Sequence, residues 1–286
     1  MTHQPKYKLA SRQWKGNDTV IDVRGCQIGG DELFLIAGPC AVESEEQIDE
    51  IASFISNLGI KFLRGGAYKP RTSPYNFQGL EKEGLKLLKQ VSNRYNLGII
   101  TEVMDLSLLD TVYPYTDILQ IGSRNMKNYH FLKELGKTDK PIMLKRGMDA
   151  TIEEWLLAAE YLLLGGNEKV ILCERGIRTF DSSNRNTLDI AGIALAQQLS
   201  HLPVISDPSQ ATGNRELIGA ASKASIAGGA DGLMIEVHNN PKDALSDGPQ
   251  SLYLNQLEDL LPDFEKIATA MGKTCSWAKQ PEIINA

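Results

Sequence analysis

Apolar residues in this chain fall into short runs that alternate with longer amphipathic stretches, from Leu33 to Met271. The short runs are rich in β-branched residues, which favours buried β-strands. Eight strands are predicted in this way, at 33–37, 62–63, 98–101, 118–121, 142–144, 170–172, 204–206 and 232–235. Stretches with the helical period lie between and after them, at 45–58, 80–95, 151–164, 188–199, 216–227 and 251–271. The first of these opens with Ser44 and has Gln47 three residues on, the spacing of a capping box.

The alternation of strand and helix predicts a parallel sheet, and eight such units predict closure into a (β/α)8 TIM barrel. An open doubly wound sheet is the alternative. No Gly-x-Gly-x-x-Gly motif follows the first strand to support it, because the glycines at 25–30 lack that spacing and precede the strand. We therefore expect one barrel domain over residues 33–272.

Two shorter segments flank the predicted barrel. Residues 1–32 form an N-terminal extension, in which 20–23 and 26–28 predict a small hairpin that closes the bottom of the barrel. This extension is too short for an independently stable domain, so we expect no feedback inhibition through a fused sensor. Residues 273–286 show no clear period and are expected to form a tail that is loosely attached or contacts another subunit.

Composition narrows the class of protein. The chain has 286 residues with 42% hydrophobic content, enough for one substantial core. It carries 36 acidic against 30 basic residues and a sequence pI near 5.4, so neither nucleic acid nor an anionic membrane is expected as a partner. The four cysteines show no close pairing and residues 1–15 are too polar for a signal peptide, which indicates a cytoplasmic protein.

Polar residues gather immediately after the predicted strands. In a closed barrel these positions meet at one face, so an acidic protein would collect several cations around one mouth. The residues in question are Cys40, Arg64, Glu102, Arg124, Lys145, Arg146, Glu174, Arg175, Asp207, Gln210, Glu236 and His238. Such a mouth suits a ligand with several negative charges, either two phosphates or a phosphate and a carboxylate.

A proline-restricted loop follows the second strand. Pro70 and Pro74 fix their own φ and disfavour helix in the residues before them, so Lys69, Arg71 and Thr72 are presented on a segment of limited freedom. Guanidinium and hydroxyl donors suit a phosphate, and a restricted loop loses little entropy on binding. A solvated surface turn is the plainer alternative for this loop taken alone.

A second group of residues suits a metal ion. The first, seventh and eighth strands become neighbours when the barrel closes, so Cys40, Gln210, Glu236 and the later Asp247 would offer sulfur and oxygen donors to a divalent cation. His238, two residues after Glu236, is expected to face the same way, as a spare ligand or a pocket acid/base.

Several runs of the sequence resemble 3-deoxy-D-arabino-heptulosonate 7-phosphate (DAHP) synthases in the short form that has no fused regulatory domain. The similarity extends from about Tyr7 to about Met271, and long matching runs are more specific than any single motif. The runs are IAGPC at 36–40, RGGAYKPRTSP at 64–74, QIG at 120–122, LKRG at 144–147, LCERGIR at 172–178, EVH at 236–238 and ALSDG at 244–248.

The resemblance implies a transferase that condenses phosphoenolpyruvate with erythrose 4-phosphate, the first step of the shikimate pathway to chorismate and the aromatic amino acids. Arg124, Lys145 and Arg175 would hold phosphoenolpyruvate. The aldose phosphate would be held by residues of the proline-restricted loop, with Arg64 between the two substrates; the loop residues are Lys69, Pro70, Arg71 and Thr72. Catalytic roles would fall to Lys69, Glu102, Lys145 and His238, with Glu102 positioning a water. The family is usually dimeric or tetrameric, so a homo-oligomer is expected.

One position departs from the family pattern. The family has a metal-binding histidine after Asp-Pro-Ser, and this chain has Gln210. An amide oxygen is a weaker donor than imidazole, so the expected divalent metal (Mn, Fe, Zn or Co) would be held less tightly. Three outcomes stay open, in this order: a weaker or harder metal such as manganese bound through Cys40, Gln210, Glu236 and Asp247; recruitment of His238; or a site that has lost the reaction.

Two alternative functions follow. A sister enzyme, 3-deoxy-D-manno-octulosonate 8-phosphate synthase, uses a five-carbon aldose phosphate and typically carries Lys-Ala-Asn-Arg-Ser where this chain has Lys-Pro-Arg-Thr-Ser at 69–73, which favours the four-carbon sugar. A catalytically silent homologue that binds phosphorylated metabolites is the second alternative, supported by Gln210 alone.

Overall fold

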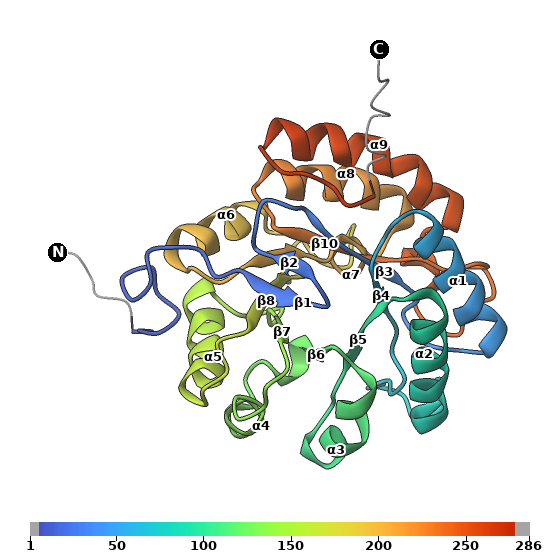
Figure 1. The fold of residues 1–286 in the computed structure, drawn as a ribbon, viewed down its shortest axis with the longest axis horizontal. Helices are drawn as coiled ribbons and strands as arrows, with labels where there is room; N and C mark the ends of the chain where they lie inside the picture. The colour runs from blue at the N-terminus through green and yellow to red at the C-terminus, as the bar shows by residue number, and fades with distance from the viewer. Residues whose placement is uncertain (1–5, 278–286) are drawn as a thin grey trace.

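The computed structural model describes residues 6–277, and its centre is a closed barrel of eight parallel strands in the order β10-β3-β4-β5-β6-β7-β8-β9 (Figure 1). The predicted barrel is confirmed, and each predicted strand overlaps an observed one. The barrel strands are β3 (Phe34–Gly38), β4 (Phe62–Arg64), β5 (Gly98–Glu102), β6 (Ile118–Ile121), β7 (Ile142–Lys145), β8 (Val170–Glu174), β9 (Val204–Ser206) and β10 (Gly232–Glu236).

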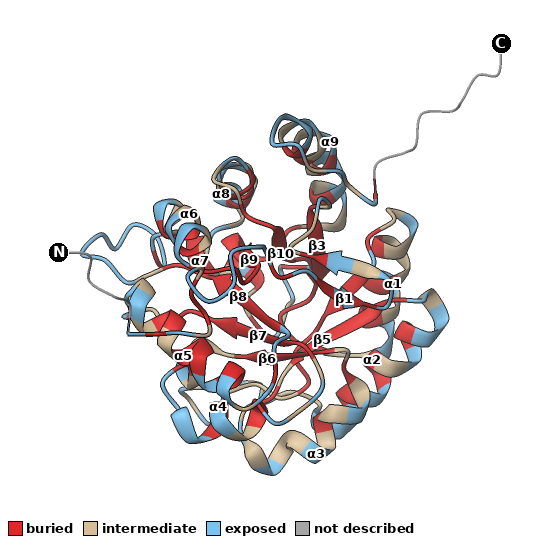
Figure 2. Cartoon of the chain, turned by 60° about the vertical axis from the view of Figure 1, so that its left-hand side comes forward, coloured by how far each residue is buried: buried red, intermediate tan, exposed pale blue. Residues whose placement is uncertain are grey.

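Helices surround the strands, and their buried faces turn toward the sheet (Figures 1 and 2). The α-helices are α1 (Glu45–Asn57), α2 (Glu81–Tyr95), α3 (Leu109–Val112), α4 (Tyr129–Leu135), α5 (Ile152–Leu164), α6 (Ile190–Leu199), α7 (Pro208–Thr212), α8 (Arg215–Ala227) and α9 (Leu254–Ala270). Short 3-10 turns occur at η1 (Leu106–Leu108), η2 (Tyr113–Tyr115), η3 (Ser123–Asn125) and η4 (Gly248–Gln250). The sequence pattern missed α3, α4 and α7 because helices of four to seven residues are too short to show a period.

The start of α1 differs slightly from the predicted capping box. The Ser44 side chain accepts a hydrogen bond from the backbone N–H of Gln47, as expected. The side chain of Gln47 accepts from the backbone N–H of Glu43 instead of returning to Ser44. The cap therefore also fixes Glu43, a residue that contacts the loop near the candidate site.

The N-terminal hairpin closes the amino-terminal end of the barrel. Strand β1 (Ile21–Val23) pairs antiparallel with β2 (Cys26–Ile28). Arg24 and Gly25 between them have φ of +54° and +79°, the left-handed values that a two-residue type I′ turn requires. Ile21, Val23 and Ile28 pack in one cluster with the apolar side chains of the barrel interior. The hairpin prediction is confirmed, and substrate access is left to the opposite end.

The segment after α9 is attached to the barrel as far as it is described. Lys273 Nζ lies 3.0 Å from an oxygen of Asp231, and the backbone N–H of Thr274 donates to the carbonyl of Asp31. Trp277 is buried in the cluster that α1, α2, α8 and α9 form against the sheet. Residues 273–277 are therefore attached to the barrel instead of loose, and the alternative of a contact with another subunit stays a prediction. Residues 278–286 lie outside the described residues.

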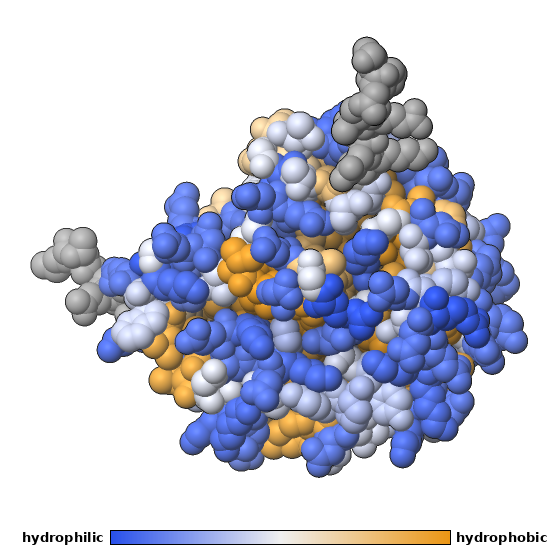
Figure 3. Space-filling view, in the orientation of Figure 1, coloured by the Kyte–Doolittle hydropathy of each residue, from blue (hydrophilic) through white to orange (hydrophobic). Residues whose placement is uncertain are grey.

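The surface is mostly hydrophilic on the face shown in Figure 3, with separate apolar patches between the charged side chains. Among residues 6–277, no helix combines the length and the apolar character that crossing a lipid bilayer requires.

Shortening a buried side chain of the N-terminal hairpin is expected to destabilise the barrel. Ile28 is fully buried, so Ile28→Ala should lower the free energy of unfolding by about 2–5 kcal/mol. Val20, in the same segment, is 48% exposed, and Val20→Ala should stay within about 0.5 kcal/mol of the wild type. Urea unfolding followed by circular dichroism measures the free energy of unfolding of both variants. Equal losses for the two substitutions would contradict the packing of Ile28 against the barrel interior.

Candidate active site

A cavity opens at the carboxyl-terminal end of the barrel strands. Its walls come from loops that follow different strands, so residues far apart in sequence face one space. The lining residues are Lys69, Pro70, Arg71, Glu102, Gln120, Gly122, Ser123, Arg124, Lys145, Met148, Arg175, Arg185, Gln210 and Asp247. An adjoining recess shares part of this wall and reaches Cys40 and Arg64. The structure thus brings most of the sequence-predicted site residues together.

Cations dominate the wall of the cavity. Lys145 is almost completely buried, and its Nζ donates to Asp207 Oδ2 at 2.6 Å. Arg175 is buried, and its Nε has no hydrogen-bond partner among residues 6–277. Burial lowers the pKa of Arg175, which means that its charge is poorly compensated within the protein. An anion in the cavity would supply the missing compensation.

Buried opposite charges balance one another behind the cations. Arg64 Nη1 lies 3.1 Å from Glu236 Oε1 and 4.0 Å from Asp207 Oδ2. Burial opposes the charge of Arg64, but Glu236 and Asp207 outweigh it and raise the pKa of the guanidinium. Burial likewise opposes ionisation of Asp207, and Lys145 and Arg64 outweigh it and lower the pKa of that carboxyl. Arg64 and Asp207 are therefore held in their charged forms.

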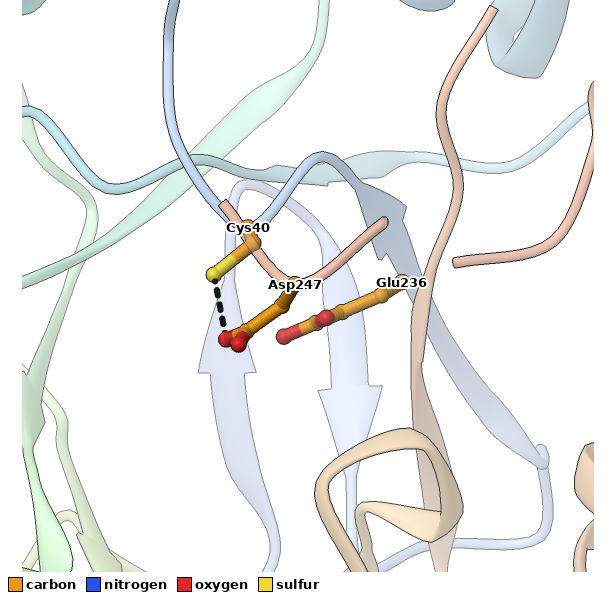
Figure 4. Close-up of side chains that lie close together, drawn as sticks. All are labelled: Cys40, Glu236 and Asp247. Carbon is orange, nitrogen blue, oxygen red and sulfur yellow. Dashed lines mark hydrogen bonds between the residues drawn. The ribbon is translucent and has the colours of Figure 1, made fainter. Parts of the chain in front are cut away.

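A cysteine and two carboxylates form a cluster beside the cavity (Figure 4). The sulfur of Cys40 and carboxylate oxygens of Glu236 and Asp247 lie within 4.8 Å of one another. Burial raises the pKa of Cys40 to about 11, so its thiol stays protonated at neutral pH and donates to Asp247 Oδ2 at 3.0 Å. The sulfur also accepts from Lys69 Nζ at 2.9 Å.

The donors of this cluster fit a divalent cation. Gln250 Nε2 donates to Glu236 Oε2 at 2.7 Å, whereas Glu236 Oε1 is buried without a hydrogen-bond partner among residues 6–277. Its contact with Arg64 is close but not aligned for a hydrogen bond. A buried carboxylate oxygen with a free lone pair, next to a thiol and a second carboxylate, is a ready metal ligand.

Asp247 reaches the cluster from a loop whose backbone is unusual. Its φ is +54°, in the left-handed region, and η4 begins at the next residue. The loop is tied to the barrel nearby, because the backbone N–H of Leu245 donates to Glu43 Oε1 at 2.9 Å. Ser246 Oγ accepts from Arg71 Nη1 at 2.8 Å and lies 3.3 Å from Cys40 Sγ, so it connects the proline-restricted loop to the cluster.

His238 does not line the cavity, which corrects the expectation of a spare metal ligand or pocket acid/base. Its Nδ1 accepts from the backbone N–H of Asn240 at 3.0 Å, so a neutral ring carries its proton on Nε2. That nitrogen lies 3.2 Å from Glu43 Oε2 and 3.0 Å from Gln47 Nε2. Both nitrogens are occupied near the start of α1, where His238 helps Glu43 to hold the loop that carries Asp247.

Arg146 and Glu174 also differ from expectation, because they pair with each other outside the cavity. Arg146 Nη1 donates to Glu174 Oε2 at 2.8 Å and to Asp189 Oδ2 at 2.9 Å. Successive residues of a strand face opposite sides, so Lys145 points inward and Arg146 outward. The same alternation separates Glu174 from Arg175.

Two residues of the proline-restricted loop are placed differently from the rest. Thr72 is exposed and lines neither the cavity nor its recess. Lys69 lies deeper than expected for a phosphate ligand alone, because its Nζ also donates to the carbonyl of Cys40 at 2.9 Å. Burial disfavours its charge, but Cys40 outweighs this effect and raises the pKa of Lys69.

Glu102 faces the cavity between two neighbours that define its position. Gln120 Nε2 donates to Glu102 Oε2 at 3.3 Å. A Cβ atom on Gly122 would lie 2.3 Å from Glu102 Oε1, so glycine is needed there for the carboxylate to occupy this place. These two neighbours therefore hold the Glu102 carboxylate at the wall of the cavity.

Sequence reasoning missed several lining residues. Arg185 is the most prominent: it lies ten positions after Arg175, in the long connection to α6, and its Nη1 is 3.9 Å from Asp247 Oδ1. A search confined to strand ends could not find it. Ser123 and Gln120 adjoin predicted residues and could have been found from the QIGSR run alone.

Comparison with known proteins decides the family. Residues 15–273 match the DAHP synthetase I family. The chain belongs to the DAHP synthetase I family. It is 49% identical over 266 residues to phospho-2-dehydro-3-deoxyheptonate aldolase of Thermotoga maritima, covering 93% of this chain and 79% of the relative. It is 31% identical over 247 residues to 2-dehydro-3-deoxyphosphooctonate aldolase of Acidithiobacillus ferrooxidans, covering 80% of this chain and 87% of the relative.

Solved structures in this DAHP synthetase family share the fold. The crystal structure of the Thermotoga maritima DAHP synthase superposes with a TM-score of 0.93 at 48% identity, covering 96% of this chain and 80% of that one. A truncated form of 3-deoxy-D-arabino-heptulosonate 7-phosphate synthase from the same organism gives 0.88 at 44% identity, covering 94% and 99%.

The two arginines that follow neighbouring strands should differ sharply in their effect on stability. Arg146→Met leaves Glu174 buried without its partner and should lower the free energy of unfolding by about 3–5 kcal/mol, and adding Glu174→Gln should recover much of that loss. Arg175→Met removes a poorly compensated charge and should leave the free energy of unfolding unchanged or higher. Chemical denaturation of the three variants measures these free energies of unfolding. Equal losses for Arg146→Met and Arg175→Met would contradict the conclusion that only Arg146 compensates a buried carboxylate.

Proposed function

We propose that this protein condenses phosphoenolpyruvate with erythrose 4-phosphate to give 3-deoxy-D-arabino-heptulosonate 7-phosphate and phosphate. The observation that carries the proposal is one cavity lined by six cations, in an acidic protein, beside a Cys/Glu/Asp cluster. Two substrates that carry two phosphates and a carboxylate need such a wall of charge. Membership of the DAHP synthetase I family supports the same reaction.

Phosphoenolpyruvate would occupy the inner part of the cavity. Arg124, Lys145 and Arg175 line it together, and Arg175 has donor capacity that no group in residues 6–277 uses. Arg64 lines the adjoining recess, where its guanidinium offsets the negative charges of Glu236 and Asp207. The enol carbon C3 would then face the cluster.

The aldose phosphate would lie toward the proline-restricted loop. Arg71 and Pro70 line the cavity, and Arg124 Nη1 donates to the carbonyl of Pro70 at 3.2 Å, which ties this loop to the phosphoenolpyruvate side. Arg71 would bind the sugar phosphate, and Arg185 adds a further cation to the lining of the cavity. Thr72 joins this set only if its loop turns inward on binding.

The chemistry joins C3 of phosphoenolpyruvate to the aldehyde carbon of the sugar. A divalent cation on Cys40, Glu236 and Asp247 would polarise the aldehyde, which lowers the barrier because charge develops on its oxygen. Lys69, beside Cys40, can give that oxygen a proton. C2, left with cationic character, takes a water oriented by Glu102, and the C2–O bond to phosphate then breaks.

Metal binding should release a proton. Burial raises the pKa of Cys40 to about 11, so the metal-free site holds a thiol near pH 7, and binding through the thiolate expels its proton. Mn²⁺ or Co²⁺ affinity should therefore rise roughly tenfold per pH unit between about pH 7 and 9. Calorimetry in buffers of different ionisation enthalpy counts the proton, and Cys40→Ser is the matched control that should abolish the release. No proton release from the wild type would contradict a sulfur ligand.

The reaction is tested by phosphate release from phosphoenolpyruvate with each of two sugars. We expect turnover with erythrose 4-phosphate, much slower turnover with arabinose 5-phosphate, and dependence on added Mn²⁺ that a chelator reverses. Faster turnover with arabinose 5-phosphate would assign the octulosonate reaction instead. No release with either sugar across several metals would overturn catalysis and leave a metabolite-binding homologue. Light scattering checks the expected dimer or tetramer.

A further inference from the structure

Gln210 stands between the cation wall and the cysteine cluster. It is the third residue of α7, and its backbone N–H donates to Asp207 Oδ1 at 2.9 Å, the bond that caps this helix. Its side chain lines both the cavity and the recess. Position alone therefore permits either a metal ligand or a contact to substrate.

The hydrogen bonds of Gln210 distinguish these roles. Lys145 Nζ donates to Gln210 Oε1 at 3.3 Å, in addition to its bond with Asp207. This contact fixes the orientation of the amide, because exchanging its oxygen and nitrogen would turn an NH2 donor toward an ammonium group. The oxygen is thus engaged with a cation, and no group among residues 6–277 accepts a hydrogen bond from the NH2.

A metal ligand needs a free lone pair aimed at the ion. Gln210 Oε1 is a neutral oxygen that already faces the Lys145 ammonium, so it brings no negative charge to offset the repulsion between that ammonium and a divalent cation. The NH2 group offers no lone pair at all. The three donors of Cys40, Glu236 and Asp247 already lie together. Cys40 and Glu236 also face cations, Lys69 at 2.9 Å and Arg64 at 3.1 Å, but a thiolate and a carboxylate attract a divalent cation by their own negative charge, which a neutral amide lacks. The metal site is complete enough without residue 210.

We infer that Gln210 serves the substrate anion instead of the metal. Its oxygen holds Lys145 in place, and its NH2 donates to a phosphate or carboxylate oxygen of phosphoenolpyruvate. The protein then supplies three metal ligands, and the remaining coordination positions belong to water or substrate. This inference rests on the proposed function, because it takes phosphoenolpyruvate as the anion in the cavity.

Two substitutions separate the roles. Gln210→Ala removes both contacts, and Gln210→Glu keeps the size and oxygen but replaces the NH2 donor by an anion. Both should raise the KM and the dissociation constant for phosphoenolpyruvate about ten- to hundredfold, the loss of one hydrogen bond to a charged group. Gln210→Ala should not change the affinity for Mn²⁺ by more than about twofold. Gln210→Glu adds a negative charge in the recess that holds Cys40, so it tests phosphoenolpyruvate binding only. Glu236→Gln is the positive control and should weaken Mn²⁺ binding at least about tenfold.

Mn²⁺ affinity is measured by chelator competition on the full chain without substrate, and phosphoenolpyruvate binding by equilibrium titration. Weaker Mn²⁺ binding in Gln210→Ala, by tenfold or more and with unchanged phosphoenolpyruvate affinity, would make the amide a ligand and overturn the inference. Unchanged affinity for both would overturn it as well. The metal titration needs no turnover. If the wild type were inactive with both sugars, the proposed function would be refuted, but the titration would still show whether residue 210 binds metal. Circular dichroism confirms that each variant is folded.

Discussion

A buried set of alternating charges at the mouth of the barrel is the constraint on which the site depends. Asp207 is its centre: one carboxylate oxygen caps α7 and the other pairs with Lys145, and Arg64 stands between Asp207 and Glu236. Arg64 and Asp207 are held in their charged forms by oppositely charged neighbours, so removing a member of the set would leave an uncompensated buried charge. The cap of α7, the cavity cation Lys145 and the cluster carboxylate Glu236 are in this way parts of one electrostatic arrangement.

The same residues connect the two halves of the site. Lys69 bonds to both the sulfur and the carbonyl of Cys40, and Ser246 contacts Arg71 on one side and Cys40 on the other. The proline-restricted loop is therefore hydrogen-bonded directly to the Cys40, Glu236 and Asp247 cluster. In the proposed reaction, an aldose phosphate bound at Arg71 would be held by the same hydrogen-bonded unit as the cluster, which would keep its aldehyde carbon close to the activating group.

The sequence allowed the barrel and much of the cavity to be predicted, because parallel strands that close on themselves must bring their carboxyl ends together. The pairs Lys145/Arg146 and Glu174/Arg175 show where that rule is too coarse. Only one residue of each pair faces inward, and the two-residue period of a strand could have identified it. Arg185 could not be found in this way, since a long connection brings it to the mouth. His238 shares the period of Glu236, but strand β10 ends at Glu236 and local bonds near α1 determine where the ring lies.

The left-handed backbone at Asp247 limits what evolution can place there. A carboxylate is needed for the cluster, yet most side chains are disfavoured at φ near +54°, and aspartate is among the few that adopt this conformation readily. Glutamate would keep the charge and meet a backbone penalty, whereas glycine would fit the backbone and lose the ligand. The local fold thus favours aspartate over glutamate. Substitution at this position is restricted by the backbone conformation as much as by the need for a carboxylate.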